Sequence, residues 1–223
     1  MPYSSISKPI RVKICGLTQT QQALDIAKLG ANSIGFICVE RSPRYLTPEK
    51  IKAIAISLSS NIDKVGVFAD HSTAEIAAVV KTARLTSVQL HGAESPDFCR
   101  QLRQVIPSDI ELIKAFRIKT AASLNDTKAY SDCVDTLLLD AYDPQMLGGT
   151  GKTIDWQDLK QFEPTLPWLL AGGLTPNNIN DALGRLQPNG IDLSSGVERS
   201  PGDKDLSKVQ QLFEQLSRGL KTF

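Results

Sequence analysis

The feature of this sequence that most constrains its fold is a regular alternation of short apolar runs with longer amphipathic stretches. Short runs of β-branched and aliphatic residues are typical of strands, whereas longer stretches with apolar residues three and four apart indicate helices. We predict strands at 10–15, 33–38, 64–69, 87–90, 110–116, 136–140, 168–171 and 190–194. Helices are expected at 20–29, 47–58, 73–83, 95–105, 176–186 and 204–216, with short or irregular ones at 121–130 and after 155.

Eight consecutive βα units favour an α/β fold, a single (β/α)8 or TIM barrel with a closed eight-stranded parallel sheet. The chain has 223 residues, a length that one such barrel fills, and closure leaves no exposed sheet edge. An open doubly wound sheet is the alternative, but it usually has fewer strands and a GxGxxG fingerprint, which does not follow the first strand here. We expect one domain over 1–223, with 1–9 as a flexible N-terminal extension.

Charge and composition exclude several kinds of partner. Lysine and arginine number 25 against 24 aspartates and glutamates, so no basic excess exists to hold nucleic acid. No apolar run is long enough to span a membrane, and the N-terminal residues lack the apolar core of a signal peptide. The four cysteines form no CxxC pair and only two histidines occur, so we expect reduced thiols, no metal site and a cytoplasmic location.

Polar residues and glycines gather where the predicted strands end. Because the strands of a parallel barrel all run the same way, these residues meet on one rim, where barrel enzymes have their active sites. Seven of the eight strands are followed by such residues: Cys15, Gly16, Arg44, Asp70, His91, Gly92, Asp140, Gly172, Gly173, Ser194, Ser195 and Gly196. The rim is therefore the predicted site, although the fold alone names no reaction.

The last two strand ends predict a phosphate site. AGGLTPNN and DLSSGVE place small residues where free backbone N–H groups can approach an anion, and loops after strands seven and eight often bind phosphate in this architecture. The residues expected to form this cradle are Gly172, Gly173, Ser194, Ser195 and Gly196. The alternative is that Gly172 and Gly173 only make a tight turn.

A third glycine-rich segment, GGTGKT at 148–153, is not a nucleotide-binding P-loop. That motif needs a glycine five residues before the glycine that precedes the lysine, and Met146 stands at that position. One interpretation is a flap that excludes water when substrate is bound, and the other is a surface loop without function. ATP is not an expected ligand.

Blocks of sequence along the chain resemble phosphoribosylanthranilate isomerase. The first half contains VKICGLT at 12–18, GFICVERSPRYLTPE at 35–49, VGVFAD at 65–70 and VQLHGAE at 88–94. The second half contains LLLDAYDPQMLGGTGKTIDW at 137–156, LAGGLTPNNI at 170–179 and GIDLSSGVERSPGDKD at 190–205. The blocks follow the family's order and cover nearly the whole chain, whereas any one of them would be a weak match.

The resemblance implies an Amadori rearrangement, in which N-(5'-phosphoribosyl)anthranilate becomes 1-(2-carboxyphenylamino)-1-deoxyribulose 5-phosphate in tryptophan biosynthesis. By the matching motifs, Asp140 would be the general acid and Cys15 the general base, with no cofactor. Arg44 would bind the anthranilate carboxylate, because a guanidinium pairs with a carboxylate through two hydrogen bonds, and it would otherwise be a surface cation. His91 is given no catalytic role; it orients substrate or satisfies a backbone carbonyl. The other cysteines are expected in the core: Cys38, Cys99 and Cys133.

One ion pair follows from the alternation of side chains along strands. If Cys15 faces the barrel interior, Lys13 faces it too, and in a closed barrel the last strand lies beside the first. Asp192 shares that interior if Ser194 points inward, so we expect Asp192 to pair with Lys13, and we count it among the substrate-binding residues. A cation such as Lys13 would favour the Cys15 thiolate that a base requires.

Three alternatives stay open. A related barrel enzyme, such as an indole-glycerol-phosphate synthase or a ribulose-phosphate epimerase, would share the phosphate loops, but neither the synthase's catalytic lysines nor the epimerase's metal-binding histidines are found. A dual isomerase would also accept the aminoimidazole analogue of histidine biosynthesis. A catalytically silent phosphate-binding subunit would not need both Cys15 and Asp140. The expected partner is a phosphorylated sugar, and the chain is expected to be a monomer or a homodimer.

Overall fold

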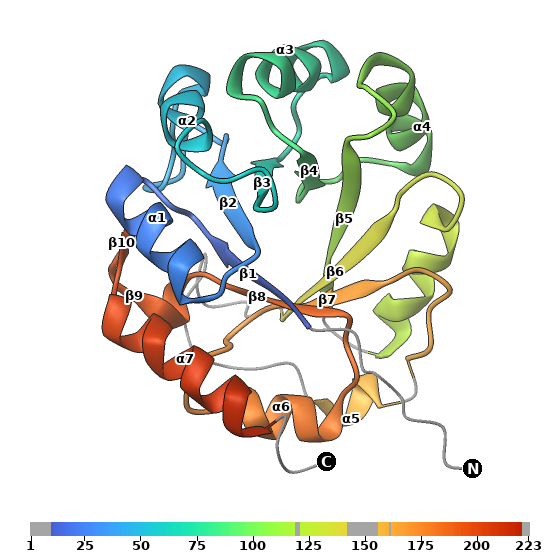
Figure 1. Cartoon of the computed structure of the whole chain (residues 1–223). Helices are drawn as coiled ribbons and strands as arrows, with labels where there is room; N and C mark the ends of the chain where they lie inside the picture. The colour runs from blue at the N-terminus through green and yellow to red at the C-terminus, as the bar shows by residue number, and fades with distance from the viewer. Residues whose placement is uncertain (1–9, 119–120, 142–155, 161, 220–223) are drawn as a thin grey trace, which may run out of the picture.

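Eight parallel strands close into a barrel in sequence order, as the alternation predicts (Figure 1). The structure is a computed structural model that describes residues 10–118, 121–141, 156–160 and 162–219. The strands are β1 Arg11–Cys15, β2 Ser33–Ile37, β3 Asp63–Phe68, β4 Ser87–Leu90, β5 Glu111–Ile118, β6 Thr136–Ala141, β7 Trp168–Leu170 and β8 Gly190–Leu193. All eight predicted strands are confirmed. The extension at 1–9 and the glycine-rich segment at 148–153 lie outside the described residues.

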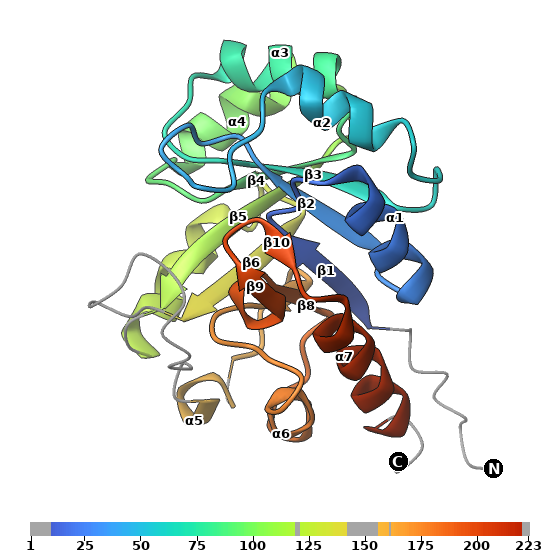
Figure 2. The ribbon, with the colours of Figure 1, turned by 90° about the vertical axis from the view of Figure 1, so that its left-hand side faces the viewer.

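Helices form the outer layer, with α2, α3 and α4 on one side of the barrel and α5, α6 and α7 on the other (Figure 2). Their bounds are α1 Thr20–Leu29, α2 Pro48–Ala55, α3 Thr73–Ala83, α4 Pro96–Val105, α5 Trp156–Leu159, α6 Ile179–Arg185 and α7 Leu206–Gly219. The oxygens of Thr47, Ser72 and Ser95 cap the backbone N–H groups that begin α2, α3 and α4. The irregular segment predicted at 121–130 is a 3-10 helix, η1 Ala121–Tyr130.

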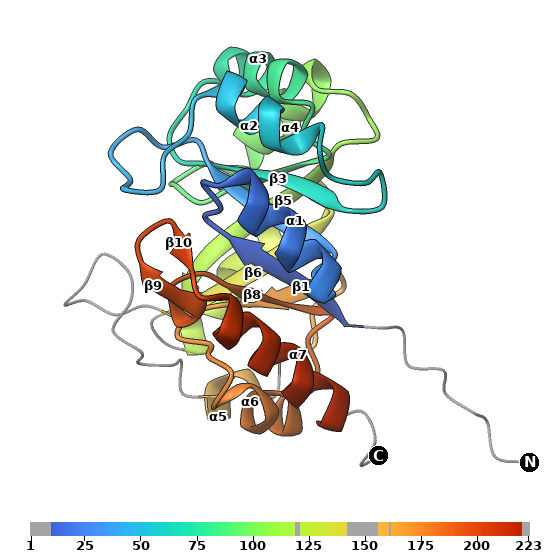
Figure 3. The ribbon, with the colours of Figure 1, turned by 60° about the vertical axis from the view of Figure 1, so that its left-hand side comes forward.

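A small antiparallel hairpin, β9 Glu198–Ser200 and β10 Asp203–Lys204, was not predicted from the sequence. It follows a 3-10 turn, η2 Ser195–Val197, and lies at the end of the molecule toward which β1 runs (Figure 3). Gly202 makes its turn with a φ of 84°. The helix expected from residue 204 therefore begins only at Leu206, because Lys204 belongs to the hairpin.

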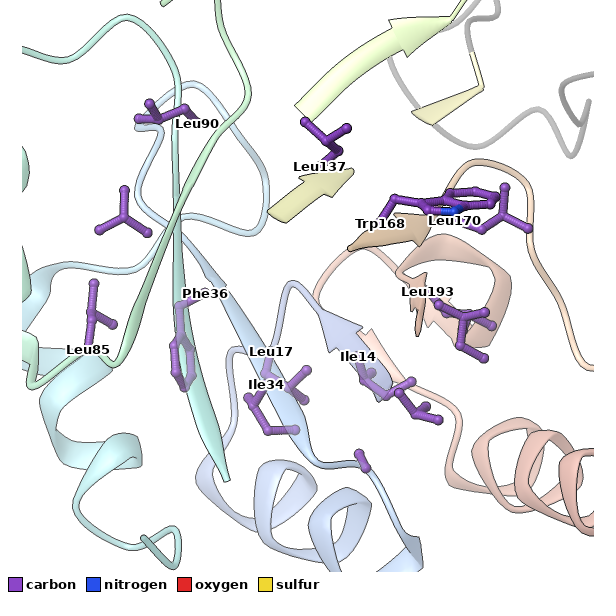
Figure 4. Packing of buried hydrophobic residues seen from close by; sticks show 14 of the residues in the cluster. Ile14, Leu17, Ile34, Phe36, Leu85, Leu90, Leu137, Trp168, Leu170 and Leu193 are labelled. Atoms are coloured by element: carbon purple, nitrogen blue, oxygen red, sulfur yellow. The ribbon is translucent and has the colours of Figure 1, made fainter. Parts of the chain in front are cut away.

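Two apolar clusters divide the core, one outside the barrel wall and one inside it. The outer cluster packs the strands against the helices and includes Ile14, Leu17, Ile34, Phe36, Leu85, Leu90, Leu137, Trp168, Leu170 and Leu193 (Figure 4). The inner cluster consists of Val65, Ile113, Ala115, Leu138, Leu169 and Ala171. Since side chains alternate along a strand, Ile14 points outward and its neighbours in β1 point into the barrel.

Polar side chains close the amino end of the barrel interior. Arg11 donates two hydrogen bonds to Glu111, at 2.7 and 2.8 Å, and Thr136 and Ser87 donate to the same carboxylate at 2.7 and 3.0 Å. Burial acts to raise the pKa of Glu111, but the Arg11 pair and the hydroxyl hydrogen bonds outweigh burial and lower it. We call these four residues the amino-end network. It fixes strands that are far apart in the sequence at the end opposite the predicted site.

Two further observations concern the helices and the cysteines. Within the described ranges, no helix combines the length and the apolar character needed to cross a bilayer. All four cysteines are free and buried, as expected of reduced thiols. Cys38, Cys99 and Cys133 belong to the outer cluster, so their predicted place in the core is confirmed.

Candidate active site

The structure brings the predicted residues to the carboxyl-end rim of the barrel. Cys15 is the last residue of β1 and Asp140 lies one residue before the end of β6. His91 directly follows β4, Ala171 separates β7 from the glycine pair, and Ser194 directly follows β8. Parallel strands end on the same side of a barrel, so residues far apart in the sequence share one mouth.

Cys15 is buried, with 6% of its surface exposed, and its thiol depends on a glycine in the neighbouring strand. Cys15 and Gly35 are register partners between β1 and β2. A Cβ atom on Gly35 would lie 2.7 Å from the Cys15 Sγ, which is closer than such atoms can approach. The missing side chain at residue 35 is therefore what makes room for the thiol.

Lys13 and Asp192 form the predicted ion pair inside the barrel. The Lys13 Nζ donates to an Asp192 oxygen at 2.9 Å, and the lysine is completely buried. The other Asp192 oxygen, Oδ1, is buried without a hydrogen-bond partner among the described residues. Burial acts against the charge on Lys13, but Asp192 and Cys15 outweigh it and raise the pKa of the lysine. The interior position of both side chains is thus confirmed.

The expectation that Lys13 favours the Cys15 thiolate is only half right. Lys13 and Lys204 both act to lower the pKa of the thiol, but burial is the largest influence and raises that pKa above its ordinary value. Burial removes water that would otherwise hydrate a thiolate, and this favours the neutral thiol. The surroundings therefore reduce the cost of the thiolate without removing it.

Arg44 is not a free surface cation, because Glu198 holds it. The Arg44 Nε donates to Glu198 Oε1 at 2.9 Å, and the Arg44 Nη2 donates to Oε2 of the same carboxylate. Gly16, with a φ of 78°, lies beneath the arginine, since a Cβ atom there would be 2.6 Å from the Arg44 Cδ. The arginine therefore crosses the backbone next to Cys15.

Glu198 and Lys204 are the residues that sequence reasoning missed. Both are buried, and the Lys204 Nζ donates to Glu198 Oε1 at 2.7 Å and to the Ser194 backbone oxygen at 3.3 Å. Burial acts to raise the pKa of Glu198, but hydrogen bonds from Arg44 and Lys204 outweigh it and lower it. In the sequence both residues look like ordinary surface charges. The signal in the sequence is that both residues lie within the GIDLSSGVERSPGDKD block at 190–205.

Asp140 and His91 meet across the mouth, where both side chains are partly exposed. The His91 Nε2 lies 3.3 Å from Asp140 Oδ2, and the His91 Nδ1 lies 2.9 Å from the Nε2 of Gln89. Of the two roles expected for His91, contact with a backbone carbonyl is not found among the described residues, because both ring nitrogens face side chains. A backbone contact of that kind belongs to His71 instead, whose Nδ1 lies 3.0 Å from the Ala69 oxygen.

A second buried glutamate shapes the loop after His91. Glu94 accepts hydrogen bonds from the Lys114 Nζ at 2.9 Å and from the backbone N–H groups of Asp70 and Gly92, each at 3.0 Å. Lys114 also donates to the Gly92 oxygen at 2.8 Å. A pocket of about 810 Å³ opens over this loop and extends to His91. This side of the barrel mouth therefore combines an open pocket with a loop that several hydrogen bonds hold in place.

The two glycine-containing loops after β7 and β8 lie in contact. Gly172 and Gly173 have φ values of 85° and 64°, and the Gly173 oxygen accepts from Asn178 at 2.9 Å. A Cβ atom on Gly196 would collide with the Leu174 backbone oxygen. The tight turn that formed the alternative interpretation is thus present, and it does not conflict with anion binding by the same backbone.

Metal ligation was not expected, and the described residues contain no group of three or more His, Cys, Asp or Glu side chains that could hold an ion. What the rim does contain is a buried thiol, a partly exposed carboxylate and a paired guanidinium. Fold and rim together define a (β/α)8-barrel protein of the enzyme class, whose rim carries side chains of the kinds that transfer protons and pair with anions.

Comparison with known proteins gives the family. The family model for N-(5'phosphoribosyl)anthranilate (PRA) isomerase matches residues 12–215. The N-(5'-phosphoribosyl)anthranilate isomerase of Crocosphaera subtropica is 58% identical over 209 residues, which are 94% of this chain and 99% of the relative. The chain belongs to the phosphoribosylanthranilate isomerase family.

Solved structures agree with this assignment. The crystal structure of phosphoribosyl anthranilate isomerase from Thermotoga maritima superposes with a TM-score of 0.86 at 33% identity, over 94% of this chain and 100% of that one. A further structure of the isomerase is in complex with reduced 1-(o-carboxyphenylamino)-1-deoxyribulose 5-phosphate. It has a TM-score of 0.80 at 30% identity and covers 94% of this chain and 100% of its own.

Proposed function

We propose that this chain isomerises N-(5'-phosphoribosyl)anthranilate in tryptophan biosynthesis with Asp140 as general acid and Cys15 as general base. The observation on which this proposal rests is that the two groups end β6 and β1 on one rim, within blocks of sequence that the family shares. A thiol and a carboxylate in different surroundings can do opposite work, because one is buried and the other is partly exposed.

The proton movements balance without any added group. Asp140 donates a proton to the ring oxygen as its bond to C1 breaks, and the anilino nitrogen forms an iminium with C1. Cys15 then removes the proton from C2, which leaves an enolamine. When C1 takes a proton from Cys15 and the C2 hydroxyl gives one to Asp140, the ketone forms and both residues regain their starting protonation.

Arg44 and the glycine-containing loops would hold the two ends of the substrate. The guanidinium of Arg44 lies next to Cys15 and is suited to the anthranilate carboxylate. The backbone around Gly173 and Ser195 would receive the phosphate, with Gly172, Ser194 and Gly196 completing the cradle. The complex of a related isomerase with a reduced carboxyphenylamino sugar phosphate supports a ligand with an anion at each end. Asp192 has one buried oxygen without a partner among the described residues, which makes it a candidate for a substrate hydroxyl.

Two substitutions test the acid and base assignments. Cys15→Ala keeps a small apolar residue at the end of β1, and Asp140→Asn keeps the shape of the carboxylate without its acidic proton. General acid or base catalysis contributes roughly 10²- to 10⁴-fold, so each variant should lower kcat by about that factor while KM changes far less. The measurement is the loss of phosphoribosylanthranilate fluorescence, with circular dichroism as the control for folding.

A near-normal kcat in folded Cys15→Ala would exclude the thiol as the base. His91 or Asp70 would then be the next residue to substitute, since both lie at the same mouth. Assays with the aminoimidazole analogue of histidine biosynthesis decide whether the chain is a dual isomerase. Loss of both activities in the same variants would indicate a shared site.

Three further proposals concern the setting of the enzyme. We infer a single domain over 1–223, supported by the match of the family model to residues 12–215. We infer a cytoplasmic location, supported by four cysteines that are all free thiols. The chain is proposed to act as a monomer or homodimer, and sedimentation equilibrium distinguishes the two.

A further inference from the structure

Glu198 is a buried carboxylate that the proton-transfer steps do not use. Only 7% of its surface is exposed, yet it accepts hydrogen bonds from the Arg44 Nε at 2.9 Å, the Lys204 Nζ at 2.7 Å and the Gly202 N–H at 3.1 Å. The Lys208 Nζ donates to its backbone oxygen at 2.9 Å. A buried charge with this many partners cannot turn away without leaving several of them unsatisfied. Its position is therefore fixed.

The hydrogen bonds between Arg44 and Glu198 use only one edge of the guanidinium group. Nε and Nη2 form the side edge of the fork, and both face Glu198. Nη1 makes no hydrogen bond to any described residue, and Nη2 has a second hydrogen atom. Nη1 and Nη2 together form the end edge, whose two parallel N–H groups match a second carboxylate. One carboxylate can thus hold the arginine while another binds to it.

The same glutamate reaches the backbone that positions Cys15. Lys204, held by Glu198, donates to the Ser194 backbone oxygen at 3.3 Å, and the Ser194 Oγ donates to the Cys15 backbone oxygen at 3.1 Å. Arg44 lies over Gly16, the residue after Cys15. Glu198 therefore connects two cations to the end of β1 from the hairpin.

We propose that Glu198 is a positioning residue for the isomerisation: it holds the side edge of Arg44 so that the end edge receives the substrate carboxylate, and it keeps Lys204 beside Cys15. The inference rests on the proposed carboxylate-binding role of Arg44. The opposite possibility is that Glu198 competes with the substrate for Arg44. The two differ in sign, because removal of a competitor lowers KM and removal of a support raises it.

The first experiment compares Glu198→Gln, Arg44→Ala and the double variant in steady-state assays. Loss of a charge-assisted contact corresponds to about 10- to 100-fold, so we expect KM to rise by that factor in each single variant. In the Arg44→Ala background, Glu198→Gln should change KM less than about threefold, because the residue through which it acts is gone. The matched control is Asp203→Asn, which disturbs the same hairpin at its Arg199 pair without touching Arg44.

Each outcome has a separate meaning. A lower KM in Glu198→Gln, or fully multiplicative effects in the double variant, would overturn the positioning role. An unchanged KM in Glu198→Gln with a raised KM in Arg44→Ala would overturn this inference and leave the carboxylate clamp intact. An unchanged KM in Arg44→Ala would overturn both. If Glu198→Gln does not fold, Arg44→Lys applies the same test. Glu198 would then bind the single ammonium of the lysine, and no second pair of N–H groups would remain for the substrate. A KM close to that of Arg44→Ala supports the proposal, and a wild-type KM overturns it.

A second readout separates positioning from mere support of the hairpin. The charged and titratable groups around Cys15 come from four strands and the segment between β2 and α2: Lys13, Cys38, Arg44, Asp192, Glu198 and Lys204. Removing the Glu198 charge leaves Lys204 and Arg44 unopposed, so the thiolate forms at lower pH, whereas Lys204→Met shifts its formation to higher pH. The rate of Cys15 alkylation by iodoacetamide, followed by peptide mass spectrometry across pH, measures both. Identical pH profiles in wild type and both variants would overturn the part of the proposal that concerns Lys204.

Discussion

Two buried glutamates, one on each side of the mouth, make nearly the same contacts but differ in one partner. Glu94 and Glu198 each accept from a buried lysine, at 2.9 and 2.7 Å, and each accepts from a glycine N–H group. The remaining partner differs. Glu94 receives another backbone N–H group, that of Asp70, whereas Glu198 receives Arg44. Glu94, whose partners are a lysine and the backbone, fixes a loop, whereas in our proposal Glu198 also positions Arg44, whose Nη1 has no hydrogen-bond partner among the described residues.

The largest effect should come from Glu94→Gln, which leaves the Lys114 ammonium buried without its counter-charge. Breaking a buried pair by removing one partner costs about 3–5 kcal/mol, so the free energy of unfolding in urea should fall by about that amount. KM should change less than in Glu198→Gln, since Glu94 holds only Lys114 and backbone. As a control, Asp132→Asn removes an exposed pair with Arg100 and should cost at most about 1 kcal/mol. Equal losses in the two variants would break the comparison.

Two glycine substitutions sharpen the comparison, and each should lower the free energy of unfolding by about half as much as Glu94→Gln. A Cβ atom on Gly92 would collide with the carboxylates of Asp70 and Glu94, so Gly92→Ala should lower the free energy of unfolding by about 1–3 kcal/mol with little change in KM. Gly16→Ala costs about 1–2 kcal/mol at a left-handed φ and displaces Arg44, so it should also raise KM.

The control for both glycine variants is Gly184→Ala, where a Cβ atom meets nothing within 4 Å. Gly184 lies in α6, and replacing a helical glycine by alanine stabilises by up to about 1 kcal/mol. Urea denaturation of the three variants measures the free energy of unfolding, and steady-state kinetics measures KM. A raised KM in Gly92→Ala would show that the two sides of the mouth are not functionally distinct.

A smaller effect is expected when acid titrates Glu198. Burial opposes its ionisation, but Arg44 and Lys204 lower its pKa below the ordinary 4.5. A carboxyl group whose folded pKa is depressed stabilises the fold above the unfolded pKa and loses that contribution as pH falls through the folded value. The difference in unfolding free energy between wild type and Glu198→Gln should therefore be constant above about pH 5 and shrink below 4.5. A difference that grows on acidification would contradict the ion pair.

The smallest effect should come from His91→Asn. The His91 Nε2 is 3.3 Å from the Asp140 carboxylate, a long contact between partly exposed groups. A single hydrogen bond of this kind contributes about 0.5–1.5 kcal/mol, so kcat should fall by less than roughly tenfold. Stopped-flow or steady-state fluorescence resolves such a change. A loss near that of Asp140→Asn would give the histidine a catalytic role and move the chemistry toward the Glu94 side.

The sequence was sufficient for the barrel because each strand has a strong local signal. β1 and β8 alternate outward aliphatic residues with inward polar ones, and that periodicity, together with closure of the barrel, predicted that Lys13 pairs with Asp192. The hairpin has no such signal. Its strands are only three and two residues long, and its order depends on tertiary contacts such as Gln22 with Asp203. Glu198 and Lys204 were missed for this reason: nothing local distinguishes a buried charged pair from two surface charges.

The rim residues show the same difference between features with a local sequence signal and features that depend on tertiary contacts. Motif resemblance predicted Cys15, Asp140 and Arg44, and strand ends predicted that they would meet. The partners that set their behaviour come from elsewhere in the chain, such as Gly35 against the Cys15 thiol. The sequence indicated that the Cys15 thiol faces the barrel interior, but not that burial would outweigh Lys13 and raise the pKa of the thiol.

The amino-end network has a consequence for how substrate enters the barrel and product leaves it. Arg11 and Glu111 fill the amino end of the barrel interior, and the inner apolar cluster fills its middle. Among the described residues, the interior is therefore accessible from the carboxyl end and does not form a channel through the barrel. Substrate and product of an isomerisation have the same atoms and must use that opening in turn. A departing product therefore leaves through the opening by which the next substrate enters, and we expect added product to inhibit in competition with substrate.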